Sequence, residues 1–275
     1  MEFLGENRIW QKNNTYCYTL PNGTYKTFTK KITNQQLKKA LHNVDYYNTY
    51  KKYVQLNGTK FGDLDKARMY PFAVLLNTWI YNNLIHNVEN FIPNYNDFCN
   101  LYILNYCHPT ENGLTFNENA CLDKIEFSDI AMRIRIGYPY GSFLREFYLK
   151  NCFIEYFEKK NVDINVCYSI HDDYYNAIDI IFEKNKRYLG VCVLDASKKS
   201  KKMKQKKDTN RHKTIENNIV ISNKDGFIKD KNIIPRMNFY TEVFGNDIEH
   251  IGEINVPKLE TIYKFADEVV QYFEH

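Results

Sequence analysis

The sequence predicts a mixed α/β (α+β) protein, with a mixed central sheet flanked by helices and a mainly helical N-terminal region. Two observations support this fold class. Apolar residues recur with helical spacing in much of the first part of the chain, whereas a helix and several strand-length apolar runs follow in the second part. Between them, residues 108–123 contain Pro109, Gly113 and several asparagines, which favour a loop. We therefore expect a mainly helical region with a β-hairpin at residues 1–123 and an α/β core at residues 124–275.

The N-terminal region opens with a predicted β-hairpin. Thr15–Leu20 and Thr24–Ile32 alternate between apolar and polar residues, and the Asn-Gly dipeptide at 22–23 tolerates the positive φ of a tight turn. Thr33 followed by Gln36 has the spacing of a capping box, which predicts the start of a helix. Helical spacing of apolar residues predicts two further helices, at about Pro71–His86 and Tyr95–Tyr106.

The C-terminal region has the pattern of an α/β core. Gly141–Lys160 is predicted to be a helix, because its aromatic and aliphatic residues form one broad apolar face. Three strands are expected to follow, at Ile164–Ile170, Asn176–Phe182 and Tyr188–Leu194. A last helix is expected, with Pro257 in its first turn.

Composition limits the cellular location that we expect. No run of about 18 or more apolar residues occurs, so we expect no membrane-spanning helix. Met1–Lys12 contains two glutamates and lacks the apolar stretch of a secretory signal. The seven cysteines are scattered and form no Cys-x-x-Cys pair, which is typical of reduced, buried thiols. We therefore expect an intracellular, cytoplasmic protein without a membrane partner.

The basic residues are concentrated in one segment. The chain carries a net charge of +4, while Ala196 to Lys213 contains nine Lys or Arg and one Asp, a local net charge of +8, which leaves −4 for the remainder (4 − 8 = −4). Lysines bind phosphate groups by charge without reading bases, so we expect sequence-independent binding to nucleic acid. The expected contact residues are Lys198, Lys199, Lys201, Lys202, Lys204, Lys206, Lys207, Arg211 and Lys213.

Three acidic residues stand out in the predicted core. Glu146 lies in the first turns of the helix expected from Gly141, Asp179 interrupts an apolar strand, and Asp195 ends the next strand directly before the lysines. A buried charge must be paired, hydrogen-bonded or metal-bound, and carboxylates beside a cationic segment suit metal-dependent phosphodiester cleavage. Structural roles remain open for two of them: Asp179 as a hydrogen-bonded acid, and Glu146 as an acid favoured by the helix dipole.

The segments around these acids resemble the PD-(D/E)xK, or restriction-endonuclease-like, nuclease superfamily. They are Gly-Ser-Phe-Leu-Arg-Glu-Phe at 141–147, Asn-Ala-Ile-Asp-Ile-Ile-Phe at 176–182 and Tyr-Leu-Gly-Val-Cys-Val-Leu-Asp at 188–195, and the resemblance covers roughly residues 126–215. It implies a restriction-endonuclease-like core in which a helix Glu, a strand Asp and a Glu-x-Lys on the next strand surround one or two Mg²⁺ ions, with Mn²⁺ as a substitute.

The third motif departs from the family pattern. Cys192 occupies the Glu position and Leu194 the Lys position, and strand alternation puts Asp195 on the other face from Cys192 unless the strand end twists. The resemblance then implies that Lys198 or Lys199 takes over the role of the lysine. The implied catalytic residues are Asp179, Lys198 and Lys199, and the implied metal ligands are Glu146, Asp179 and Asp195.

Three functions remain open from the sequence. The first is a Mg²⁺-dependent DNA endonuclease that resembles type II restriction enzymes and acts on double-stranded DNA. A homodimer of such an enzyme would bring its two sites to the two strands. The second is a degenerate nuclease fold that binds nucleic acid without cutting it. The third is a protein-binding or structural factor whose lysines are incidental.

Overall fold

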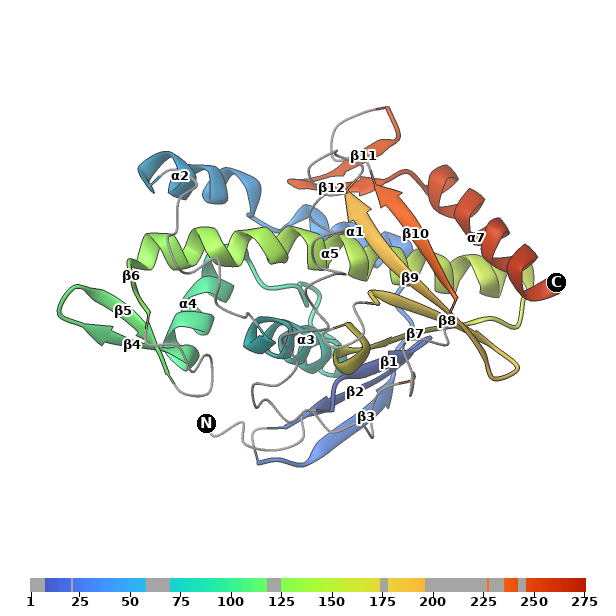
Figure 1. The fold of residues 1–275 in the computed structure, drawn as a ribbon, viewed down its shortest axis with the longest axis horizontal. Coiled ribbons are helices and arrows are strands. Elements are labelled where there is room, and N and C mark those ends of the chain that lie inside the picture. The colour runs from blue at the N-terminus through green and yellow to red at the C-terminus, as the bar shows by residue number, and fades with distance from the viewer. Residues whose placement is uncertain are drawn as a thin grey trace.

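A computed structural model of the chain describes residues 8–20, 22–57, 70–117, 125–173, 178–195, 227, 235–241 and 246–275. Its longest element is α5 (Asp129–Lys160), a helix that runs along the length of the molecule in Figure 1. A seven-stranded mixed sheet lies beside it, and shorter helices and two small sheets complete the fold. The structure confirms the mixed α/β class with helices around a central sheet.

The central sheet joins strands from both parts of the chain. Its strands lie in the order β10-β9-β8-β7-β1-β2-β3. Their bounds are β1 Trp10–Lys12, β2 Thr15–Thr19, β3 Tyr25–Thr29, β7 Asn165–Ser169, β8 Ile180–Lys184, β9 Arg187–Asp195 and β10 Arg236–Thr241. β7, β8 and β9 form an antiparallel meander, and β10 is parallel to β9. β1 pairs antiparallel with β7, with Trp10 opposite Ser169, so strands of the first 123 residues extend the sheet of the core.

The local signals near the N-terminus are confirmed. β2 and β3 pair antiparallel, and Gly23 adopts a φ of +81° in the turn between them. α1 (Asn34–His42) begins with a complete capping box. The backbone N–H of Gln36 donates to Thr33 Oγ1 at 3.2 Å, and the backbone N–H of Thr33 donates to Gln36 Oε1 at 3.0 Å. Both N–H groups would otherwise lack a partner at the helix start.

The remaining elements surround α5. The helices are α2 Tyr47–Asn57, α3 Tyr70–Ile85, α4 Tyr95–Tyr106 and α7 Leu259–Glu274. The small sheets are β4 Cys107–Thr110, β5 Gly113–Phe116 and β6 Glu126–Phe127, and β11 Ile248–Ile251 with β12 Ile254–Pro257. α3 and α4 confirm the two helices expected in the N-terminal region. No helix among the described residues is long and apolar enough to cross a membrane.

The prediction for Pro257 is wrong. Pro257 is the last residue of β12, opposite Ile248 of β11, and α7 begins only after the N-cap residue Lys258. In a two-stranded sheet a terminal proline needs no partner for a backbone N–H, so the sequence tolerates it there. The apolar face of α7 itself was correctly expected, and it includes the buried Ile262 and Val269.

The helix predicted at Gly141–Lys160 begins earlier, at Asp129, with Ser128 as its N-cap. Pro139 lies inside the helix, although proline and the glycines near it are residues that usually interrupt one. The glycines instead allow Tyr50 of α2, and Tyr46 just before α2, to approach closely. A Cβ on Gly137 would lie 2.4 Å from a ring carbon of Tyr50, and a Cβ on Gly141 would lie 2.8 Å from the hydroxyl of Tyr46.

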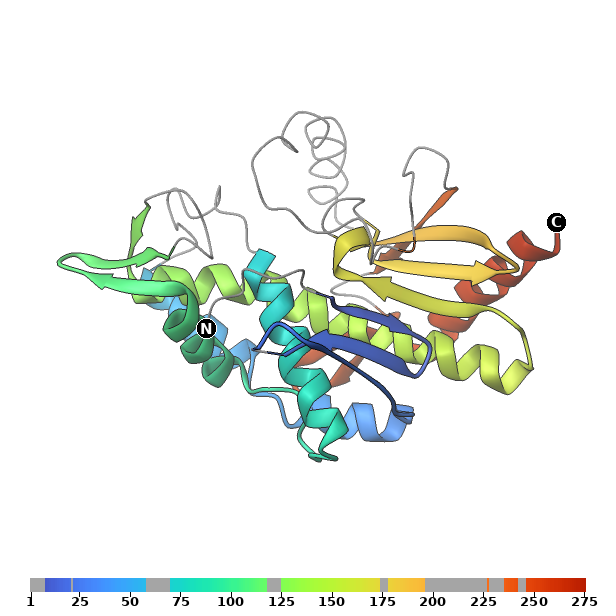
Figure 2. The same cartoon turned by 90° about the horizontal axis from the view of Figure 1, so that it is seen from below.

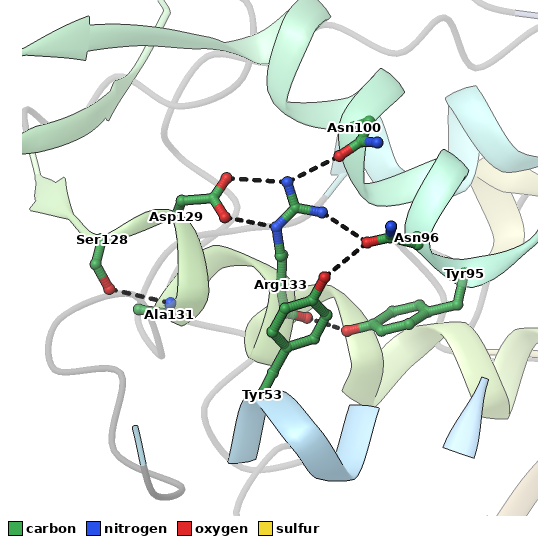
Figure 3. A network of polar contacts seen from close by, with 8 residues as sticks. All are labelled: Tyr53, Tyr95, Asn96, Asn100, Ser128, Asp129, Ala131 and Arg133. Atoms are coloured by element: carbon green, nitrogen blue, oxygen red, sulfur yellow. Dashed lines mark hydrogen bonds and ion pairs between the residues drawn. The ribbon is translucent and has the colours of Figure 1, made fainter. Parts of the chain in front are cut away.

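A polar network fixes the N-terminal end of α5 against α2 and α4 (Figure 3). Arg133 donates to both oxygens of Asp129, at 2.5 and 3.1 Å, one helical turn earlier. The same guanidinium donates to Asn96 at 3.0 Å and to Asn100 at 2.8 Å, both on α4. Tyr53 of α2 donates to Asn96 at 2.7 Å. This bidentate arrangement uses the planar fork of arginine and sets the position of the helix.

The C-terminal half of α5 packs on the sheet. Phe153 of α5 contacts the rings of Phe182 on β8, Phe239 on β10 and Phe265 on α7, with centroid distances of 5.1, 6.2 and 6.0 Å. α5 and α7 therefore cover the same face of the sheet. Figure 2 shows this half of the helix beside β7–β9, while the β4–β5 hairpin lies at the other end of the molecule.

Candidate functional site

Glu146 lies in the middle of α5, not in its first turns as expected from a helix beginning at Gly141. The dipole of the helix start acts over the first turn only, so it does not account for this acid. The helix packs against β7 on this side, and aromatic neighbours Phe143 and Phe147 are buried on either side of Glu146 in the sequence. Glu146 as a whole residue is half-buried.

Asp179 lies immediately before β8 and does not interrupt the strand as expected, because β8 begins at Ile180. Its backbone N–H donates to Val191 O at 3.0 Å, and its carboxylate accepts the backbone N–H of Val193 at 2.7 Å. In the hydrogen-bond ladder between β8 and β9, the side-chain oxygen of Asp179 thus takes the place of a backbone carbonyl as the acceptor for Val193. This places it at the end of the strand, near the plane of the sheet.

Lys150 is the feature of this region that the sequence analysis missed. Its side chain is 1% exposed, although lysine is almost never fully buried unless it is paired. Its Nζ lies 3.6 Å from the ring centroid of Tyr168 on β7, and 5.8 Å from those of Phe143 and Phe147. Among the described residues it has no hydrogen bond or ion pair. A charged residue within the apolar run 147–154, one turn after Glu146, was the available signal.

Asp173 is a second acid that the sequence analysis did not assign to the site. It lies in a helical turn that follows β7 and retains partial exposure. Tyr168 donates its hydroxyl to Asp173 Oδ2 at 3.5 Å and accepts a hydrogen bond from Asn77 at 3.3 Å. Tyr168 therefore joins Asp173 to Lys150, with its hydroxyl toward the acid and its ring face toward the ammonium.

The charges of these residues act on one another. Desolvation raises the pKa of Glu146 well above its usual range, and the negative charges of Asp179 and Asp173 raise it further. Burial lowers the pKa of Lys150 to about 8, while the charges of Glu146, Asp173 and Asp179 oppose this shift. We call these four residues the acid–lysine cluster. It draws its acids from α5, from the turn after β7 and from the start of β8.

The third motif has the register expected from its spacing. Ile180 pairs with Val191, so Asp179 lies opposite Cys192, which is buried. Asp195 ends β9 opposite Thr241 of β10, and its side chain lies outside the described part of the structure. The residues predicted to bind nucleic acid, including Lys198 and Lys199, all lie outside the described residues as well.

Carboxylates are the ligands that Mg²⁺ and Mn²⁺ prefer, so the donor chemistry of Glu146, Asp173 and Asp179 fits these ions. Burial is the main cause of the raised pKa of Glu146, and the charges of Asp179 and Asp173 add a repulsion of the kind that a divalent cation relieves. No group of three or more His, Cys, Asp or Glu side chains within the described ranges is already arranged to hold an ion. The acids would therefore have to move toward an ion to bind it together.

Comparisons with known proteins add no relative to this description. No protein-family model, no curated protein and no solved structure matches the chain. The functional assignment therefore rests on the residues of the acid–lysine cluster and on the short sequence resemblance described above.

Proposed function

We propose that the protein is a Mg²⁺-dependent endonuclease with a restriction-endonuclease-like core, which hydrolyses phosphodiester bonds of double-stranded DNA. The observation that carries the proposal is the place of Asp179, immediately before β8 and opposite Cys192 of the third motif. After burial, its negative charge also raises the pKa of Glu146 on α5. The superfamily resemblance implies a helix Glu and a strand Asp; Glu146 lies on a helix, and Asp179 lies immediately before a strand. A buried cation, Lys150, lies in the same cluster.

The residues of the cluster suggest how the chain would act. Glu146 and Asp179 would hold the metal ion, which when bound supplies polarisation of the phosphate and of the attacking water. The backbone N–H of Val193 donates to the Asp179 carboxylate, which fixes this acid beside β9. Asp195, the last residue of β9, remains a further proposed ligand. Lys198 or Lys199 remains the proposed catalytic lysine, because both come within four residues of the end of β9 in the sequence.

The proposed substrate follows from the basic segment. The local charge of +8 between Ala196 and Lys213 suits a polyanion, and its lysines would hold the DNA backbone. A homodimer would bring two sites to the two strands of a duplex. The six cysteines within the described residues are buried and form no disulfide, which supports the proposed cytoplasmic location.

Plasmid cleavage tests the proposal. Supercoiled plasmid should be nicked or linearised by the purified protein with Mg²⁺ or Mn²⁺, and remain intact with chelator. Asp179→Asn should abolish cleavage, because it removes a metal charge. The amide oxygen of Asn can still accept the Val193 N–H, so the fold and DNA binding should persist. Asp163→Asn is the matched control, since Asp163 is an exposed acid between α5 and β7.

Two results would count against the proposal. One is the absence of cleavage by the wild-type protein on many DNA sequences with either metal. The other is cleavage by Asp179→Asn at the wild-type rate. Circular dichroism of each variant shows whether a loss of cleavage reflects a loss of folding.

A second function, nucleic-acid binding without cleavage, is favoured by one observation. Cys192 lies opposite Asp179, where the superfamily signature has its Glu, and it is a buried thiol that cannot hold Mg²⁺. Gel-shift titrations separate this function from the first. If DNA binds with strong salt dependence but is never cut, the binding function applies. Replacing Lys201, Lys202, Lys204 and Lys206 with Ala should then weaken binding. It should also reduce the slope of log K against log salt concentration by about 0.9 for each lost phosphate contact.

A further inference from the structure

A pocket lies where the end of β3 and the helix α1 meet the last turn of α3 and the loop that follows it. Its volume is about 440 Å³. Pockets that bind small molecules measure about 300–1,000 Å³, so this one is large enough for such a ligand. None of its lining residues belongs to the acid–lysine cluster or to the basic segment Ala196–Lys213.

Part of the pocket wall is apolar. Ile32, Leu84 and Phe91 line it, and all three are buried residues of the hydrophobic core. Val88 lines it as well and is 43% exposed, so apolar surface also faces solvent there. A ligand that covers such a wall removes apolar surface from water. The wall therefore suits a ligand with an apolar body.

Three lysines, Lys30, Lys31 and Lys39, line the same pocket. Within the described part of the chain, Glu89 is the one acid of the lining, so the lining carries a formal charge of +2 (3 − 1 = +2). The ammonium of Lys30 donates to the amide oxygen of Asn87, which is neutral. Lys30 therefore brings a positive charge to the pocket without an ion pair inside the described ranges.

The other two lysines are held in exposed ion pairs. Lys39 pairs with Glu89, and Lys31 pairs at 2.6 Å with Glu158 of α5, which lies outside the lining. The side chains of Lys39 and Glu89 are 63% and 69% exposed. Exposed ion pairs contribute little to stability, so these ammonium groups can turn to a bound anion at small cost. Their hydrogen bonds to a phosphate would be of the strong, charge-assisted kind.

We propose that this pocket binds a phosphate monoester that carries an apolar ring, as a nucleoside 5′-phosphate does. A phosphate monoester has a charge of about −1.5 to −2 at pH 7, which matches the lining better than the single charge of a carboxylate or a phosphodiester. Lys30 and Lys39 bind the phosphate, and the apolar wall binds the base. A free nucleotide and the 5′-phosphate end of a nucleic acid both present this chemistry. The inference goes beyond the proposed nuclease function and does not depend on it.

Isothermal titration calorimetry of the full chain with adenosine 5′-monophosphate (AMP), in the presence of chelator, tests the site. AMP should bind, whereas adenosine and inorganic phosphate should bind more weakly, because each lacks one half of the ligand. Lys30→Met and Lys39→Met should each weaken AMP binding about tenfold, because each removes a charge-assisted hydrogen bond. Glu89→Gln should tighten AMP binding about fivefold, because it removes a negative charge beside the phosphate and releases Lys39. A loss of folding would not tighten binding.

Lys160→Met is the control, since Lys160 is an exposed lysine of α5 that does not line the pocket, and it should leave AMP affinity unchanged. No binding of AMP by the wild type at millimolar concentration would overturn the inference. Wild-type affinity in both Lys30→Met and Lys39→Met would overturn it as well. Plasmid cleavage without AMP binding refutes this inference alone, and AMP binding without cleavage refutes the nuclease function alone.

Labelled oligonucleotides with a 5′-phosphate or a 5′-hydroxyl, again with chelator, distinguish the two sources of the ligand. A preference for the 5′-phosphate that is lost in Lys30→Met identifies the end of a nucleic acid. Equal binding of both oligonucleotides, together with AMP binding that depends on Lys30, identifies a free nucleotide.

Discussion

Lys150→Met should make the protein more stable at neutral pH. In the folded protein, burial lowers the pKa of Lys150 to about 8 from the ordinary 10.5, even though three acids oppose the shift. At about 1.4 kcal/mol per pH unit, holding the charged form in the fold at pH 7 costs about 3 kcal/mol. Methionine has nearly the same length and no charge, and it can fill the space between Phe143 and Tyr168. We therefore expect the free energy of unfolding to rise by about 1–3 kcal/mol.

The sign of the pH dependence follows from the lowered pKa. Between pH 8 and pH 10.5 the unfolded chain binds more protons at this lysine than the folded chain does, so stability rises with pH in that window. The advantage of Lys150→Met should thus be largest at pH 7 and should shrink toward pH 10. Urea unfolding followed by tryptophan fluorescence at pH 7, 8, 9 and 10 measures both effects, with Lys160→Met as the control. A destabilised Lys150→Met protein, or a difference that does not change with pH, would refute the reasoning.

Three further predictions concern the frame around the site. Gly137→Ala should lower the melting temperature measured by circular dichroism, because its Cβ would lie 2.4 Å from the ring of Tyr50 on α2. Overpacking should destabilise the fold by about 1–3 kcal/mol, which exceeds the stabilisation of about 1 kcal/mol from the better helix propensity of alanine. Burial raises the pKa of Glu183, but hydrogen bonds from Lys12 at 3.0 Å and Asn165 at 2.6 Å outweigh it and lower that pKa overall. Its stabilisation is therefore present above the unfolded pKa and lost as pH falls through the folded one, so Glu183→Gln should cost about 1 kcal/mol at pH 7 in urea titrations, and this cost should disappear once the pH is below the lowered pKa. Arg133→Met should destabilise by about 2 kcal/mol in the same assay, since it removes the hydrogen bonds drawn in Figure 3; wild-type stability would contradict this.

The sequence predicted the elements whose signals are local. The capping box at Thr33, the turn at Gly23 and the spacing of the apolar residues in α4 each act within a few residues. The first half of α5 was missed because Pro139 and two glycines are local signals for a break. What overrides them is tertiary: Tyr46 and Tyr50, just before and within α2, pack onto the glycines, and Arg133 ties the helix to α4. Such contacts between distant segments leave no periodic pattern in the sequence.

The candidate site was accessible from the sequence only in part. Asp179 and Glu146 attracted notice because acids in apolar segments need a partner. The same argument applies to Lys150, a basic residue within the apolar run 147–154, which was not predicted as part of the site. Asp173 belongs to an acidic pair that is typical of a turn, and a turn is where it lies. Only the packing of Tyr168 between the turn and α5 links Asp173 to the other acids.

The pairing of β1 with β7 has a consequence for how the chain reaches its fold. Trp10 and Ser169 lie opposite each other although they are 159 residues apart (169 − 10 = 159). During synthesis at about 5–20 residues per second, β1 waits on the order of 10 to 30 seconds for its partner, with one edge unpaired. The β2–β3 hairpin alone is at best marginally stable in water. We therefore expect docking of β1–β3 onto β7 to be a late, slow step in refolding, and chains that end before β7 to aggregate through this open edge.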